Sequence, residues 1–248
     1  MISLNLVINF RQYSDHSSLI SAVSPAFELT AGDILNITIV FSGSYVHSDS
    51  LLLVASLVQH MRSNNIFVNV QVNGADSYAS RVDFYKLIDV PFEERYPRRN
   101  SKGRFIELKA FDADSIYRLQ DELNTILYQN GGIAKEVREL LFYCLGEIMD
   151  NTLVTNGKGL GFGLFATSQF ILKNYGELFL YSGNHYLTAK NGNYEIKSGS
   201  YWKGTVVSLR INTNIPVDYK SIMPVNHTLP DDYQFFIDKF FGQDNELW

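Results

Sequence analysis

The chain has 248 residues, of which 46% are hydrophobic and 14% aromatic, and this composition excludes an intrinsically disordered protein. Its net charge of −5 argues against a general nucleic-acid binder, because such proteins usually carry a basic surplus. The lone cysteine, Cys144, excludes an internal disulfide and fits a reducing compartment. No run approaches the ~20 apolar residues of a membrane span, and the apolar start lacks a basic leader. We therefore expect a cytoplasmic protein with no membrane association.

The first ninety residues alternate between strand and helix patterns. Strand patterns, with β-branched or alternating apolar residues, occupy residues 2–10, 35–41 and 66–72. Apolar residues at helical spacing occupy residues 48–62, and a second helix is expected through residues 84–87. Three plausible N-caps begin the first helix, namely Ser48, Asp49 and Ser50. The order predicts a small α/β layer domain over residues 1–105.

Residues 91–104, PFEERYPRRNSKGR, carry two prolines, a glycine and dense charge. Such a composition is typical of a linker, in which the basic side chains are expected to be solvated.

A second α/β domain is expected over residues 113–224. Helices are expected over about 113–128 and 134–154, and a third from Gly161 to Gly176, where glycine would supply the C-cap. Strand patterns follow over residues 177–182, 185–189, 194–197 and 205–211. Asn191-Gly192-Asn193 indicates a hairpin turn. The Phe-rich tail over residues 225–248 is expected to pack on the chain's own core, with a dimer or partner contact as the alternative.

Polar residues end the helix over 134–154. Glu147 and Asn151 are four residues apart, so their side chains point the same way. A carboxylate can act as a base, and an amide oxygen can ligate magnesium. The alternative is a polar patch that only caps the helix end.

A glycine-rich segment follows within a few residues. It contains Gly157, Lys158, Gly159, Leu160 and Gly161 and leads into a helix, whose N-terminus favours anions. Lys158 would add a cation. The segment is not a GxxxxGK[ST] loop, and it does not follow a strand as a dinucleotide fingerprint does.

Taken together, the two motifs resemble those of the GHKL (histidine-kinase-like) ATPases. Glu147 and Asn151 match the family's E-x-x-x-N box, and Gly157, Gly159, Leu160 and Gly161 match its G-x-G-L-G box. Gly204 and Thr205 match the closing G-T-x-x-x-L strand, so the resemblance covers roughly residues 113–213. It implies a layered α/β site for ATP and magnesium. In that site Glu147 is the counterpart of a general base, Asn151 holds the metal and the glycines cradle phosphates.

The chain departs from this family between the two boxes. Only five residues separate Asn151 from Gly157, where the family has core strands and an aspartate–glycine motif that reads adenine. No D-x-G-x-G occurs, so the base-recognition segment is missing. We therefore expect a degenerate ATP-binding module with weak or no ATPase activity. The alternative is a functional Mg-ATP-binding ATPase or serine kinase.

The first half resembles STAS-like domains, the fold of anti-sigma-factor antagonists. Those domains place D-S-S-G-L at the start of a helix, and here Asp49 falls where their phospho-acceptor serine sits, flanked by Ser48 and Ser50. These serines are N-cap residues or phosphorylation sites. A STAS-like and an ATPase-like half on one chain imply a regulatory protein with a protein partner, and a homodimer is a further option. The five histidines show no metal-ligand spacing, and Cys144 is expected in the core.

Overall fold

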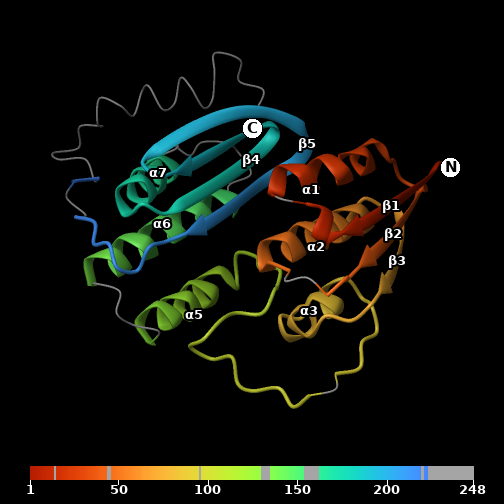
Figure 1. Ribbon diagram of the computed structural model, residues 1–248, viewed down its shortest axis with the longest axis horizontal. Helices are drawn as coiled ribbons and strands as arrows, with labels where there is room; N and C mark the ends of the chain where they lie inside the picture. Colours follow the sequence, from red (N-terminus) through yellow and green to blue (C-terminus); the bar gives the residue numbers. More distant parts are fainter. Residues whose placement is uncertain are drawn as a thin grey trace.

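The computed structural model describes residues 1–13, 15–43, 46–94, 96–129, 135–153, 162–218 and 221–222. Within these ranges the protein is a mixed α/β structure, as expected from the sequence (Figure 1). It contains a three-stranded parallel sheet near the N-terminus and a long two-stranded hairpin near the other end of the described chain. No helix in the described ranges is both long enough and apolar enough to span a bilayer.

The parallel sheet has the strand order β1-β2-β3. Its strands are β1 (Ser3–Asn9), β2 (Ile34–Val40) and β3 (Phe67–Asn73). Each crossover between them contains a helix, as parallel strands require, and these helices are α1 (His16–Val23) and α2 (Ser48–Ser63). Shorter elements complete this half, namely the 3-10 helices Phe10–Gln12 and Ser24–Glu28 and the helices α3 (Ser77–Arg81) and α4 (Phe84–Leu87).

The two faces of this sheet differ in polarity. Alternate side chains of β2 are fully buried beneath the helices, and these are Leu35, Ile37 and Ile39. The opposite face carries a row of amides, in which Asn36 donates to Asn5 at 2.9 Å and Asn69 donates to Asn36 at 2.8 Å. The sheet therefore has a single core side.

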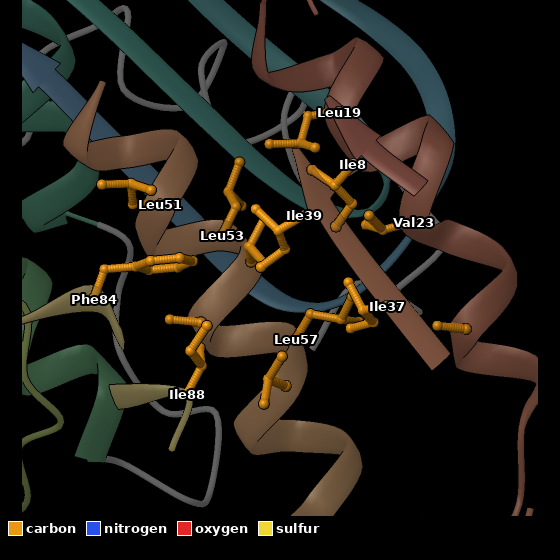
Figure 2. Close-up of a cluster of buried hydrophobic side chains, with 14 of the residues drawn as sticks. Ile8, Leu19, Val23, Ile37, Ile39, Leu51, Leu53, Leu57, Phe84 and Ile88 are labelled. Carbon is orange, nitrogen blue, oxygen red and sulfur yellow. The ribbon is translucent and has the colours of Figure 1, made fainter. Parts of the chain in front are cut away.

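The first hydrophobic cluster lies on that core side and is built from the buried faces of β1 and β2 together with α1, α2 and α4 (Figure 2). Its fully buried members include Leu19, Leu57 and Phe84. Two further members, Tyr181 and Trp202, come from the distant hairpin and are 0% and 4% exposed. The core of the first half is therefore completed by residues of the second half.

The second half begins with three helices, α5 (Ile116–Gln129), α6 (Lys135–Leu153) and α7 (Phe162–Asn174). They lead into β4 (Glu177–Lys190) and β5 (Asn193–Arg210), which form an antiparallel hairpin that curves from α7 toward α1 (Figure 1). A second hydrophobic cluster joins α6, α7 and this hairpin, and it includes Cys144, which is confirmed as a buried core residue.

Two details of the hairpin differ from expectation. Four short strands were expected, but the chain forms two long ones, and the pairing register shifts around Gly183, which has a φ of 56°. The glycine absorbs a bulge without ending the strand. The expected turn is confirmed, since Asn191 and Gly192 both have positive φ, at 53° and 77°.

The end of α7 also differs from expectation. Tyr175, not Gly176, takes the left-handed conformation, with a φ of 52°. Gly176 is needed for another reason, because a Cβ there would collide with the carbonyl oxygen of Arg210 in β5. The glycine thus allows the helix end to approach the strand closely.

The segment between α4 and α5, residues 88–94 and 96–115, contains the expected linker and forms a strap that packs on the first half. The described basic side chains of this segment are exposed, as expected, but Arg98 also pairs with Glu94 and with Asp83. The backbone N–H of Leu108 donates to the carbonyl of Val82 at 2.9 Å, and Leu108 packs against the first cluster. The expected tail over residues 225–248 lies outside the described residues, and the expected division between residues 105 and 113 stays a prediction.

Candidate functional site

The expected nucleotide site falls largely outside the described residues. Glu147 and Asn151 belong to α6 as expected, but only the backbone of each is described. The glycine-rich segment lies wholly outside the described ranges, and this covers Gly157, Lys158, Gly159, Leu160 and Gly161. Binding of ATP and of magnesium at these residues therefore stays a prediction.

Thr205 is the one member of that set whose side chain is described. It is exposed on β5, opposite Ser182 of β4, and its hydroxyl donates to the Ser182 hydroxyl at 3.3 Å. By strand alternation it shares a face with Val207 and Leu209, which pack against the second hydrophobic cluster. Thr205 therefore lies on the α6–α7 side of the hairpin.

A different polar cluster is assembled where the first half meets the hairpin. This seam consists of His16, Asp49, Ser208 and Arg210. His16 is the first residue of α1, and its Nε2 donates to Oδ2 of Asp49 at 2.8 Å. From β5, the Ser208 hydroxyl lies 3.5 Å from the same oxygen and the Arg210 guanidinium lies 3.9 Å from it. Three elements therefore meet at one carboxylate.

The local sequence explains how the two helix starts are placed. Asp15 caps α1 by accepting from the N–H of Ser18 at 2.8 Å, and this fixes His16 in the first turn. Residue 47, rather than one of the three expected candidates, is the N-cap of α2, and its side chain makes no capping bond. Asp49 lies in the first turn instead, where the helix dipole favours a negative charge, and it accepts from the N–H of Ser50 at 2.9 Å.

These contacts keep Asp49 ionised. Burial alone would raise the pKa of Asp49, but the hydrogen bond and positive charge of His16, with the Ser50 N–H, outweigh it and lower the pKa to about 2. A carboxylate with so low a pKa is a poor general base at neutral pH. Its chemistry is that of a fixed negative charge that holds neighbouring donors in place.

The rest of the seam is aromatic and ionic. The His16 ring packs on Phe179 of β4 with centroids 4.7 Å apart. Beyond it, Glu177 binds Arg210 at 3.2 Å and also pairs with Lys190. Among the described residues, no group of three His, Cys, Asp or Glu side chains could hold a metal ion. The seam is therefore an electrostatic and aromatic contact between the two halves.

Sequence reasoning singled out Asp49 but missed the residues around it. Ser208 is 159 positions away in the chain, so no local pattern could connect it with Asp49. The capping box formed by Asp15 and Ser18 was the one local signal for this region, because it marks the start of α1.

No family model matches this chain, and comparison with curated proteins and with solved structures found no significant match. The fold and the seam therefore carry the functional argument.

Proposed function

We propose that this chain is a regulatory protein of the partner-switching kind, in which the second half covers the contact surface of the first. The proposal identifies the first half as STAS-like and the second as a degenerate GHKL module. The observation that carries it is the position of Asp49, which the STAS-like resemblance places at the switch position. Side chains from both halves contact its carboxylate.

The burial of Asp49 supports a functional role for the seam. The Asp49 side chain is only 23% exposed, and the hairpin contacts the first turn of α1 through Phe179 and the first turn of α2 through Ser208. A partner that recognises this helix start must displace Ser208 and Arg210. Opening of the hairpin would thereby control access of the partner, which is how a switch couples two states.

A matched pair of charge reversals tests this proposal. Arg210→Glu puts a carboxylate beside Asp49 and opens the seam, whereas Lys190→Glu removes a cation from Glu177 alone. Both residues are exposed, at 55% and 60%, so both variants should fold. With tagged full chains in a lysate of the source organism, we expect at least one protein to be recovered about tenfold differently with Arg210→Glu than with wild type. Equal recovery with all three proteins contradicts the proposal.

The proposal also holds that the second half does not use ATP, because the segment that reads adenine is missing from the sequence. Losing several buried polar contacts to a ligand costs about 1–3 kcal/mol for each contact. Titration calorimetry of the full chain should therefore find no ATP binding tighter than about 1 mM, with or without magnesium. Micromolar, magnesium-dependent binding that Asn151→Ala abolishes would establish the alternative function, a working ATPase or kinase.

A further inference from the structure

The strap and the end of α3 together form a depression that is lined by three arginines. Its volume is about 600 Å³, and its lining consists of Arg81, Tyr96, Pro97, Arg99, Arg104 and Phe105. Three guanidinium groups line it, although the protein as a whole has a net charge of −5, and one of them, Arg81, is paired with Glu107. The exposed guanidinium groups of Arg99 and Arg104 add positive charge beside this pair, so the depression has a local field that attracts anions.

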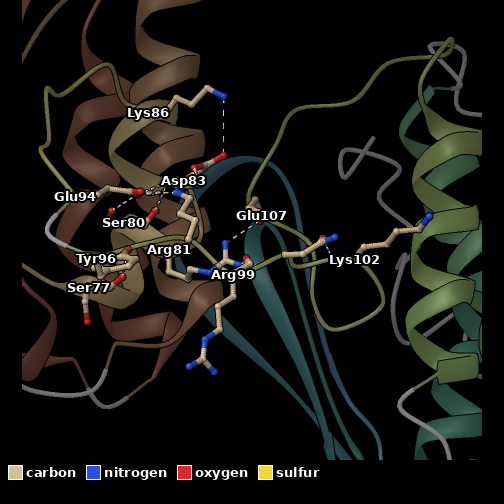
Figure 3. Close-up of polar contacts among 12 residues, drawn as sticks. Ser77, Ser80, Arg81, Asp83, Lys86, Glu94, Tyr96, Arg99, Lys102 and Glu107 are labelled. Carbon is tan, nitrogen blue, oxygen red and sulfur yellow. Dashed lines mark hydrogen bonds and ion pairs between the residues drawn. The ribbon is translucent and has the colours of Figure 1, made fainter.

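Arg81 is held rigidly at the inner side of this depression. Its side chain is 18% exposed, and its Nη1 donates to Glu107 at 3.0 Å (Figure 3). Its Nη2 donates to the carbonyl of Arg99 at 2.6 Å, and its guanidinium lies 4.4 Å from the centroid of the Phe105 ring. A guanidinium fixed in this way loses little side-chain entropy when it binds an anion.

The neighbouring Arg98 differs from the arginines of the depression, because it is held by two carboxylates and has a structural role. It pairs with Asp83 at 2.6 Å and with both carboxylate oxygens of Glu94, and Arg98 with Ser80 lowers the pKa of Glu94 to about 2. Asp83 and Glu94 are thus paired with Arg98, and Glu107 is paired with Arg81. Arg99 is exposed, and no ion pair of its side chain is found among the described residues.

The aromatic lining adds the second element of a ligand site. Tyr96 is fixed by its hydroxyl, which donates to the carbonyl of Ser77 at 3.0 Å, and Phe105 is fixed beneath Arg81. These two rings beside guanidinium groups offer apolar area to the organic part of a ligand while the arginines bind its anionic end.

We propose that this depression is a binding site for a phosphate monoester. Guanidinium forks match the geometry of phosphate oxygens, and a dianion neutralises more of the arginine charge than a single carboxylate does. The site lies on the strap, away from the seam and from Glu147 and Asn151 in sequence, so it goes beyond the regulatory function proposed above. A free nucleotide and a phosphorylated side chain both supply this chemistry.

The experiment measures binding to the full chain at low salt by calorimetry, with two probes. Adenosine 5′-monophosphate represents the free ester, and a short peptide that contains phosphoserine represents the protein-borne one. We expect at least one probe to bind with a Kd below about 1 mM and to be displaced by inorganic phosphate. The double variant Arg99→Gln/Arg104→Gln should weaken that binding at least about tenfold, since both exposed side chains line the depression.

The matched control is Arg11→Gln/Arg118→Gln, which removes two exposed arginines that do not line the depression. It should change the Kd by less than about twofold, because it reduces the net charge equally but spares the site. Binding of only one probe identifies the source of the phosphate. Absence of binding by both probes, or equal weakening in the two double variants, overturns the proposal.

Discussion

At the start of α2, the Asp49 carboxylate is the point at which three elements meet. It accepts from His16 of α1 and from its own helix, and it faces Ser208 and Arg210 of β5. Because this carboxylate is largely buried, the donors must remain in place for the charge to be tolerated. This one carboxylate therefore connects both helices to the hairpin.

Asp49→Asn should destabilise the full chain by about 2 kcal/mol at pH 7, because the low pKa of Asp49 represents stability that the neutral amide lacks. A depressed pKa in the folded state contributes stability above the unfolded value of 3.8, and this is lost as pH falls toward 2. The difference between variant and wild type should therefore shrink by about half at pH 3. Urea unfolding at pH 7, 5 and 3 measures it.

The control for this titration is Asp114→Asn, at an exposed aspartate that makes no ion pair with any residue in the described part of the chain. It should change the free energy of unfolding by less than about 0.5 kcal/mol at every pH. An Asp49→Asn effect that stays constant from pH 7 to pH 3 would show that shape, not charge, matters at this position.

A second residue-scale prediction concerns Gly176, where an added Cβ meets the backbone of β5. Gly176→Ala should lower the free energy of unfolding by about 2–3 kcal/mol, because backbone must move. Gly192→Ala meets nothing within 4 Å and carries only the cost of a positive φ, about 1 kcal/mol. Thermal unfolding of both variants should rank them in this order, and the reverse order would contradict the close approach.

At the scale of elements, the β4–β5 hairpin serves two cores. Tyr181 and Trp202 belong to the first hydrophobic cluster, whereas Leu178 and Leu180 belong to the second. The alternation of side chains across a strand makes this division possible, since neighbours face opposite sides. The two faces of the hairpin therefore pack on the two hydrophobic cores.

Trp202→Ala should cost about 3–5 kcal/mol, because it removes a side chain that is 4% exposed and packs edge-on against Phe27. The neighbouring Tyr201, at 45% exposed, is the matched control, and its replacement by alanine should cost less than half as much. Chemical denaturation of both variants gives the comparison. Equal losses would show that Trp202 does not complete the first core.

Local sequence patterns predicted the elements that have a strong apolar period. They did not predict features that depend on contacts between residues far apart in the chain. The apolar spacing of α2 and the Asn191-Gly192 turn were readable from sequence and are confirmed. The helix α1 was missed because its first turn is rich in serine, a weak helix former, and the glycines of the hairpin concealed its continuity. The seam could not be predicted from sequence, since only folding brings Ser208 close to Asp49.

At the scale of the whole molecule, the strap and the hairpin both cross between the halves. The strap packs on the first core through Leu108, and Lys109 pairs with Glu122 of α5. On the other side, the Ser21 hydroxyl of α1 lies 2.7 Å from the Ser200 hydroxyl of β5. The proposed switch depends on these crossings, because independent halves could not transmit a change from the hairpin to α2.

The most direct test of this arrangement is an engineered disulfide between Ser21→Cys and Ser200→Cys in the full chain. Because the two hydroxyls are in contact, mild oxidation should close an intramolecular bond, visible as a loss of two hydrogens in the intact mass. The pair Ser21→Cys and Thr205→Cys, five residues further along β5, should stay reduced, since the strand rises about 3.3 Å per residue. Equal oxidation of the two pairs, or failure of the first pair to close, would contradict the seating of the hairpin on α1.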